Sequence, residues 1–328
     1  MRNPAAIAAP KGVSPELPDH DAGRPTRAPG EARPVTARTA FLLLAMVVVL
    51  WGINWPIMKV GVAAIPPLWF GVLRLAIGAL VLFLVLIATG RFTAPARGDL
   101  SIVASVGLLQ MAGFLGLVNV ALLHVGAGRS AVLAYTTPLW VVPGAALFLG
   151  ERATAPKLVG VALGLAGIAM LFSPAAVDWS SGEAMLGNAL LMIAAVLWAI
   201  AILHVRGHRW RLTPLQLAPW QLLIGLPLLA AIALWVEGVP RIQWSGAVIA
   251  ILVYNGALAT ALCYWAAVTV TRALPAVTTS LSLLCVPVVG LLSSALSLGE
   301  PLEPPLLLGC GLILAGAALV NLADQRRL

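Results

Sequence analysis

Long apolar segments follow one another through most of this chain, and they restrict the fold more than any other feature of the sequence. A bilayer core about 30 Å thick is spanned by a helix of roughly 20 apolar residues, and in lipid only helices and closed barrels satisfy their own backbone. These segments are far longer than barrel strands of about 10 residues. We therefore predict an all-α integral membrane protein with ten transmembrane helices, near 39–61, 67–89, 100–122, 127–149, 156–173, 185–204, 214–236, 245–269, 274–297 and 304–322.

The composition excludes a pair of soluble domains, because 61% of the residues are hydrophobic and only 10% are charged. Residues 1–38 differ: they are rich in Pro, Ala, Gly and charge and contain no apolar run, which predicts a disordered tail. The tail is not a signal peptide, since the apolar stretch that follows is long enough to span and no cleavage site closes a short apolar region. Residues 323–328 form a second short tail.

Basic residues set the expected orientation, because Lys and Arg accumulate on cytoplasmic loops. With the N-terminus inside, the inner segments hold 16 of the 20 basic residues, and the outer side holds only Lys59, Arg129 and Arg241. We predict a multi-pass protein of the inner (plasma) membrane with both termini cytoplasmic. This topology also explains the net charge of +8 without a nucleic-acid partner, so the lipid bilayer is the expected surrounding.

The chain contains an internal repeat. The stretch "PLWVVPGAALFLGERATAPKLVGVALGLAG" (138–167) aligns without a gap on "PVVGLLSSALSLGEPLEPPLLLGCGLILAG" (287–316). This places Pro138 on Pro287 and Glu151 on Glu300. A weaker match at an offset of 147 links "VLW" at 49–51 to "VLW" at 196–198. We therefore predict two five-helix repeats, 39–173 and 174–322.

An odd number of helices in each repeat turns the second repeat upside down relative to the first. Inverted repeats are typical of transporters, because the two halves can exchange inward-open and outward-open shapes around one central site. Pro138, Glu151, Pro287 and Glu300 then mark corresponding helix joints at opposite faces. For each Glu two interpretations stay open: a carboxylate that offsets the dipole of a helix start, or a gating residue.

These features resemble the EamA-type branch of the drug/metabolite transporter superfamily. The resemblance rests on the duplicated "ALLHVGAGRSAVLAYTTPLWVVPGAALFLGERATAPKLVGVALGLAGI" stretch, on "LWGINWPIMKVG" in the first helix, and on Arg74 in "PLWFGVLRLAIGAL". It covers nearly all of 39–322. The resemblance implies a basket-like bundle with a central cavity and export of small metabolites, often amino acids, without ATP hydrolysis.

Polar and aromatic residues inside the predicted spans are the candidates for a substrate site, since such residues are costly in lipid unless they face a cavity or a partner. The candidates are Trp51, Asn54, Trp55, Arg74, Gln110, Tyr135, Thr136, Tyr254, Asn255, Tyr264, Trp265 and Ser282. Trp51, Asn54 and Trp55 share one helix face at i, i+3 and i+4. Alternatives stay open: helix contacts or an interfacial belt for the Trp residues, a helix C-terminus for Arg74, and bonds within their own helix for the hydroxyls.

The sequence holds no catalytic or metal-binding arrangement of His, Cys, Asp or Glu, so we predict no enzyme activity, no metal and no cofactor. No Asp or Glu lies inside a predicted span, which favours gradient-driven export without a carboxylate at mid-membrane. We predict export of amino acids, including aromatic or bulky apolar ones, by alternating access. The rivals are a carrier of another organic solute, such as a drug-like compound or a nucleotide sugar, and a membrane enzyme or scaffold. The sequence does not determine the oligomeric state, but we expect a monomer to be sufficient for transport.

Overall fold

The computed structural model describes residues 36–150, 154–173, 179–208, 210–274, 279 and 282–325. All regular elements within these residues are helical. Of the predicted tails, 1–38 and 323–328, residues 1–35 and 326–328 lie outside the described residues, as does Glu151. Residues 37–38 and 323–325 belong instead to helices, because the first and last helices extend past the predicted spans.

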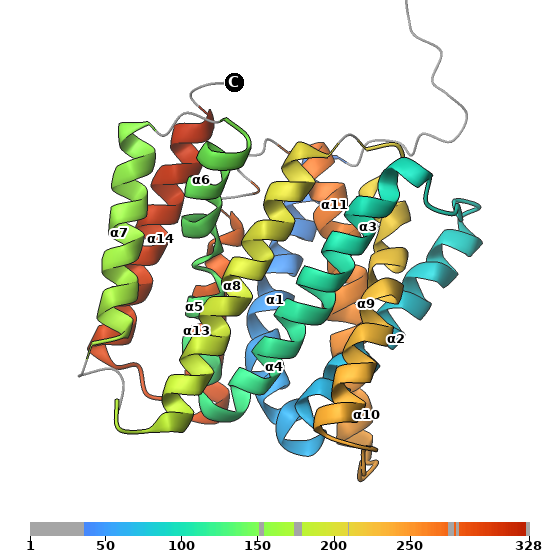
Figure 1. Ribbon diagram of the computed structural model, residues 1–328, viewed down its shortest axis with the longest axis horizontal. Coiled ribbons are helices and arrows are strands. Elements are labelled where there is room, and N and C mark those ends of the chain that lie inside the picture. Colours follow the sequence, from blue (N-terminus) through green and yellow to red (C-terminus); the bar gives the residue numbers. More distant parts are fainter. Residues whose placement is uncertain are drawn as a thin grey trace, which may run out of the picture. The chain divides into compact units, whose positions relative to one another are not determined.

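The elements fall into ten stretches of helix separated by short connections (Figure 1). Those before residue 174 are α1 (Ala37–Ala64), α2 (Pro67–Ala88), η1 (Arg97–Asp99), α3 (Leu100–Ser105), η2 (Val106–Phe114), α4 (Leu115–His124), α5 (Ala127–Ala134), α6 (Thr137–Phe148) and α7 (Ala155–Leu171). Those after it are α8 (Gly182–Gly207), α9 (Pro214–Val236), α10 (Gly246–Val253), η3 (Tyr254–Leu262), α11 (Cys263–Ala273), α13 (Cys285–Leu298) and α14 (Pro304–Gln325).

Eight of these stretches are long and apolar enough to cross a membrane, and α7 and α13 are shorter apolar helices. The two shorter helices fall where spans 156–173 and 274–297 are predicted. The structure therefore bears out the all-helical membrane architecture, whereas the count of ten spans stays a prediction.

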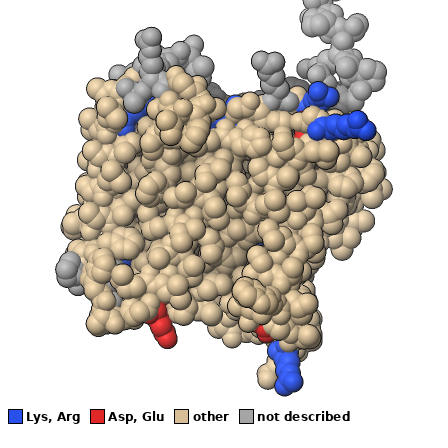
Figure 2. Space-filling view, viewed as in Figure 1, with Lys and Arg blue, Asp and Glu red and all other residues tan. Residues whose placement is uncertain are grey.

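Charged side chains are confined to the two ends of the bundle on the face drawn in Figure 2, and a broad uncharged band lies between them. Large apolar side chains point outward, with Leu296 89% and Trp235 87% exposed. An apolar surface of this extent would be a liability in water, but it matches the hydrocarbon of a bilayer.

Two pairs of turns recur along the chain. The described residues contain four glycines with positive φ: Gly90 at 66°, Gly150 at 66°, Gly238 at 70° and Gly299 at 67°. Gly90 and Gly238 each follow the second helix of a half, and Gly150 and Gly299 each follow the fourth stretch. This left-handed conformation favours glycine, so both halves end the corresponding helices in the same way.

Helices α7 and α14 lie side by side at one edge of the bundle (Figure 1). Their contact depends on glycines, because a Cβ atom on Gly316 would lie 2.3 Å from the carbonyl oxygen of Gly160. Reciprocally, a Cβ atom on Gly160 would lie 2.6 Å from the carbonyl oxygen of Gly316. Because the nearest atoms belong to the backbone and not to a flexible side chain, a side chain at either glycine would force the two helices apart.

Replacing Gly316 by Val is therefore expected to destabilise the fold by about 1–3 kcal/mol, the usual cost of overpacking. Thermal unfolding in detergent would measure it. Gly311→Val is the matched control on the same helix, since a Cβ atom there has nothing within 4 Å. Equal unfolding temperatures for the two variants would contradict the close contact.

Candidate functional site

A cavity of about 310 Å³ lies among the middle parts of several helices. Its walls come from α1, α2, η2, α4, α5, α8, η3 and α11. Seven of the predicted site residues line it together: Trp51, Asn54, Trp55, Arg74, Gln110, Tyr135 and Tyr264. Residues that are up to 213 positions apart in the chain thus meet at one site.

The α1 wall is held in place by its own polar atoms. The Trp51 indole nitrogen donates to the carbonyl oxygen of Ala259 in η3, at 2.8 Å. The amide nitrogen of Asn54 contacts the sulfur of Met58 at 2.9 Å, whereas its side-chain oxygen is buried and has no hydrogen-bond partner among the described residues. A buried acceptor without a donor costs stability, so the Asn54 oxygen is a candidate for a ligand contact.

Arg74 brings a cation to the same cavity. Its side chain is only 7% exposed; Nε donates to the Thr260 hydroxyl at 2.9 Å, and one terminal nitrogen contacts the Met58 sulfur at 3.3 Å. Neither partner is an anion, and no ion pair joins Arg74 to a carboxylate within the described residues. A buried cation without an anion is costly, and its guanidinium has donors left for a carboxylate.

Two π-helical segments shape the walls. Residues Val106–Phe114 form η2 and Tyr254–Leu262 form η3, at corresponding places in the two halves. In η3 the Thr260 hydroxyl donates to the carbonyl oxygen of Asn255, five residues earlier, at 2.7 Å. Single-turn π segments are often found at functional sites, and here two of them face one cavity.

The fourth stretch of helix is interrupted beside the cavity. Helix α5 ends at Ala134 and α6 begins at Thr137, with Pro138 in its first turn. The hydroxyls of Thr136 and Thr137 donate to the carbonyl oxygens of Leu133 and Ala134, at 2.7 and 2.8 Å. Tyr135, at the break, therefore reaches the cavity while the two threonines satisfy the interrupted backbone.

An aromatic group on the opposite wall was not predicted. Trp198 of α8 packs against Phe114, with ring centroids 4.9 Å apart, and edge-on against Tyr135 at 5.7 Å. All three line the cavity. The repeat carries the signal that could have found Trp198, because the offset of 147 that aligns the two "VLW" stretches places it on Trp51.

Five predicted site residues do not line this cavity. Thr136 is fully buried in the helix break, and Asn255 is fully buried with its amide donating to Ile251. The Tyr254 hydroxyl donates to the carbonyl oxygen of Leu50 at 2.7 Å, and Trp265 is 37% exposed. Ser282 is half-buried. The π segment η3 lies between Tyr254 and Trp265, so regular α-helical spacing does not relate the positions of these two residues.

Glu300 caps a helix other than the one that follows it. Its carboxylate accepts from the backbone N–H groups of Ala127 at 2.6 Å and Gly128 at 2.9 Å, at the start of α5. Lys59 donates to the carbonyl oxygens of Leu122 and Val125, where α4 ends. Opposite charges thus sit at the matching ends of two helix dipoles. Glu300 therefore does offset a helix dipole, but the helix that it caps is α5 of the other half and not the helix that follows Glu300 in the chain.

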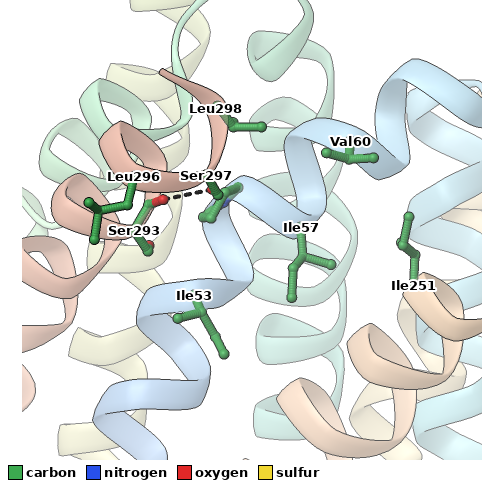
Figure 3. A pocket seen from close by; sticks show the side chains of 9 residues that line it. Ile53, Ile57, Val60, Ile251, Ser293, Leu296, Ser297 and Leu298 are labelled. Carbon is green, nitrogen blue, oxygen red and sulfur yellow. Dashed lines mark hydrogen bonds between the residues drawn. The ribbon is translucent and has the colours of Figure 1, made fainter. Parts of the chain in front are cut away.

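A second hollow offers little to a polar solute. A groove of about 470 Å³ runs between α1, α10 and α13 and is lined by side chains such as Ile53, Ile57 and Leu296 (Figure 3). Of its two serines, Ser297 donates to the carbonyl oxygen of Ser293 and Ser293 to that of Gly290. Both hydroxyls are therefore used within their own helix, which leaves Arg74 and Asn54 in the other cavity as the polar groups suited to a ligand.

The sequence pattern of the EamA-like transporter family matches residues 38–173 and, a second time, residues 185–322. The uncharacterised transporter YoaV of Bacillus subtilis is 29% identical over 86% of this chain and 96% of its own length. A probable amino-acid metabolite efflux pump of Salmonella typhimurium is 31% identical over 86% of this chain and 94% of its own length. One solved crystal structure shares the fold, with a TM-score of 0.59 and 22% identity over 89% of this chain and 99% of that chain.

The duplicated family pattern, the apolar helices and the relatives agree. Transport is the activity named for the family. This chain is a multi-pass membrane protein and belongs to the EamA-like transporter family.

Proposed function

We propose that this protein exports amino acids across the inner membrane by alternating access, without ATP hydrolysis. The observation that carries the proposal is Arg74, a buried cation on the cavity wall with no carboxylate beside it in the described part of the chain. An amino acid supplies the missing anion. Its carboxylate would accept hydrogen bonds from the guanidinium, whose planar group suits two carboxylate oxygens.

The second polar end of the substrate has a complementary atom. The side-chain oxygen of Asn54 is buried and accepts no hydrogen bond from any described residue, and the Met58 sulfur contacts both Asn54 and Arg74. An ammonium group would donate to this oxygen. The aromatic rings of Trp51, Trp55 and Trp198 around the two polar groups suit an apolar or aromatic side chain.

The name of the Salmonella relative, a probable amino-acid metabolite efflux pump, supports the substrate class and the direction of transport. A nucleotide sugar is the weaker alternative. A diphosphate carries more negative charge than a single arginine balances, and Arg74 is the sole Lys or Arg on the cavity wall in the described part of the chain.

We propose that residues 39–173 and 174–322 are the two inverted repeats that move against each other. The double match of the family pattern, the paired positive-φ glycines and the paired π segments all support a duplication. Figure 1 also draws α1 and α8, the first helices of the halves, running in opposite directions. One chain supplies the whole cavity wall, which supports a monomer as the transporting unit.

The substrate is tested with purified protein in liposomes preloaded with labelled amino acids, nucleosides, sugars and organic cations. We expect the efflux of apolar and aromatic amino acids to exceed the efflux from preloaded liposomes that contain no protein. Amino-acid amides and N-acetyl amino acids should move at least tenfold more slowly, because each lacks one of the two charged ends. Movement of another class with no efflux of any amino acid would overturn the proposal.

The orientation is tested by cysteine labelling in cells on a background that lacks Cys263, Cys285 and Cys310. We expect a membrane-impermeant thiol reagent to label Ser180→Cys from outside and to label Phe92→Cys only after permeabilisation. The reason is the excess of basic residues on the segments that include Arg91 and Arg97. The reverse pattern would place both termini outside.

Trp51→Ala is expected to lower transport of tryptophan or phenylalanine by about tenfold and that of alanine less. The substitution removes an aromatic surface from the cavity, and a bulky side chain loses more contact there than a small one. Concentration-dependent efflux in liposomes measures the effect. Trp265→Ala is the matched control, since Trp265 is 37% exposed and does not line the cavity. Equal losses for large and small substrates would assign Trp51 a packing role.

A further inference from the structure

Helices α2 and α9 are the second helices of their halves and lie against each other. The offset of 147 places Pro67, at the start of α2, on Pro214, at the start of α9. The start of each helix is hydrogen-bonded to residues near the end of the other. We name these two sets of contacts the Glu237 clasp and the Asp99 clasp.

The Glu237 clasp joins the end of α9 to the start of α2. The carboxylate of Glu237 accepts from the backbone N–H groups of Leu68 at 2.8 Å and Trp69 at 3.2 Å. In return, the Trp69 indole nitrogen donates to the carbonyl oxygen of Gly238 at 2.8 Å. A carboxylate on free N–H groups at a helix start also offsets the positive end of the dipole.

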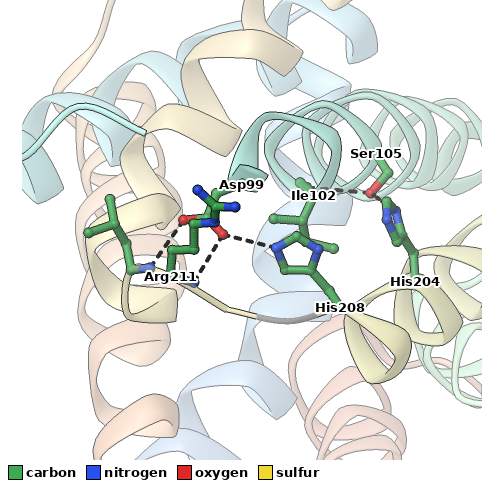
Figure 4. Close-up of polar contacts among 7 residues, drawn as sticks. Asp99, Ile102, Ser105, His204, His208 and Arg211 are labelled. Atoms are coloured by element: carbon green, nitrogen blue, oxygen red, sulfur yellow. Dashed lines mark hydrogen bonds and ion pairs between the residues drawn. The ribbon is translucent and has the colours of Figure 1, made fainter. Parts of the chain in front are cut away.

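The Asp99 clasp joins the loop after α2 to the approach of α9 (Figure 4). The carboxylate of Asp99 is fully buried and accepts from the backbone N–H groups of Arg211 and Leu212, both at 3.1 Å. His208 lies 3.0 Å from the same carboxylate. Three partners therefore satisfy a charge that has no access to water.

Side chains of α9 complete the Asp99 clasp. The Trp220 indole nitrogen donates to the carbonyl oxygen of Thr93 at 3.0 Å. The Gln216 amide nitrogen donates to the carbonyl oxygen of Arg91 at 3.4 Å. The Gln216 contact corresponds to the Trp69 contact of the other clasp. At the offset of 147, Trp69 aligns with Gln216, and Arg91 aligns with Gly238. The carboxylates come from unaligned positions, so the two ends reach the same arrangement by different residues.

Both clasps are closed in one structure, although they lie at opposite ends of the helix pair. In alternating access between inverted repeats, a contact that opens at one face corresponds to a contact that closes at the other. An occluded state would also close both gates at once, so the energetic cost of opening distinguishes a fixed contact from a gate. Opening the Asp99 clasp would also leave a buried carboxylate without its donors, which is costly in every transport cycle.

We infer that the two clasps lock α2 and α9 into one rigid unit that stays closed throughout the transport cycle, with Asp99 and Glu237 as its positioning residues. This inference rests on the alternating access proposed above. Because α2 and α9 belong to different repeats, the two repeats then do not move as two rigid bodies, and movement has to separate other contacts between them. We assign the opening to the contact of Glu300 with the start of α5, because it joins the two halves and Figure 1 draws α5 and α13 on the far side of α1 from α2 and α9.

Cross-linking tests the inference on a background without the three native cysteines. Gly98→Cys with Arg211→Cys spans the Asp99 clasp, since a Cβ atom on Gly98 would lie 2.5 Å from the Arg211 guanidinium. Pro66→Cys with Val239→Cys spans the Glu237 clasp. Gly126→Cys with Glu300→Cys spans the opening contact, where a Cβ atom on Gly126 would lie 3.0 Å from the Glu300 carboxylate. A flexible, reducible bifunctional thiol reagent joins each pair.

We expect efflux from liposomes to stay within about twofold after either clasp is cross-linked. Cross-linking Gly126→Cys to Glu300→Cys should lower efflux at least tenfold, and reduction should restore it. A tenfold loss from either clasp pair overturns the rigid unit, and undiminished efflux from the third pair overturns the assignment of the opening contact. The solute is whichever member of the panel the untreated variants export, so failure of the amino-acid assignment leaves this result interpretable.

Distances between spin labels provide a readout that needs no known solute. Labels at Phe92 and Arg211 report on the Asp99 clasp, and labels at Pro66 and Val239 report on the Glu237 clasp. Labels at Leu123 and Glu303 report on the contact of Glu300 with α5. We expect one narrow distance for each clasp and two distances for the third pair. Two distances across either clasp would overturn the inference.

Discussion

Replacing Arg74 by Gln is expected to lower amino-acid transport by about tenfold to hundredfold. Hydrogen bonds between charged groups contribute about 1.5–3 kcal/mol, and their loss weakens binding by about this factor. The loss should appear mainly as weaker apparent affinity, because the guanidinium binds the carboxylate of the substrate before the halves move. Arg74→Lys keeps the charge but not the planar pair of donors, so we expect an intermediate value. Concentration-dependent efflux in liposomes measures all three proteins.

Stability separates this role from a structural one. Arg74 is buried, and no carboxylate pairs with it among the described residues, so removing its charge relieves a desolvation cost. The Arg74→Gln variant should therefore unfold at the same temperature as the wild type or higher, while transport falls. Gln221→Met is the matched control, because Gln221 occupies the corresponding position of the second half and does not line the cavity. A destabilised Arg74→Gln protein, or equal transport losses in both variants, would contradict the proposed contact with substrate.

Asp99→Ala is expected to destabilise the protein by about 3–5 kcal/mol, the range found when one partner of a buried charge interaction is removed. The substitution leaves the N–H groups of Arg211 and Leu212 buried without an acceptor. With an unfolding entropy of about 2.1 cal/mol/K per residue, a chain of 328 residues shifts by about 1.5 °C per kcal/mol, so the unfolding temperature should fall by roughly 4–7 °C. Thermal unfolding in detergent measures the change, and Asp99→Asn, which keeps one oxygen acceptor, should lose less.

Glu183→Ala provides the comparison for Asp99. The Glu183 side chain is 85% exposed and lies 3.7 Å from His124, so its removal should change stability by no more than about 0.5 kcal/mol. A similar small change in Asp99→Ala would show that water reaches the carboxylate, and it would also weaken the case for the Asp99 clasp as a fixed contact.

The membrane architecture was predictable because every helix that spans the hydrocarbon core needs about 20 apolar residues, and such runs are visible in the sequence. The cavity was predictable where helical spacing holds. Trp51, Asn54 and Trp55 share one regular face of α1, and all three line it. Across η3 the regular spacing fails: of the residues predicted around it, Tyr264 lines the cavity, Tyr254 and Trp265 do not, and Thr260 was missed.

The clasps could not be predicted from the spacing of residues along the chain. Asp99 and Glu237 bind backbone N–H groups that every residue type except proline carries, so the sequence near Leu68 or Leu212 gives no sign of a partner. The carboxylates are also not aligned between the halves. Only the folded arrangement of α2 and α9 brings each acceptor to the helix start that it caps.

The π segments give two helices room for a change in length. A π turn holds about one residue more than an α turn, so deleting one residue between Tyr254 and Leu262 would return part of η3 to regular spacing and leave α10 and α11 close to their present register. Tyr264 and Ala267 would then stay on the cavity wall. The same deletion between Trp51 and Trp55 has no wide turn to absorb it, so it would turn the residues after it in α1 by about 100° and take Trp55 off the cavity wall.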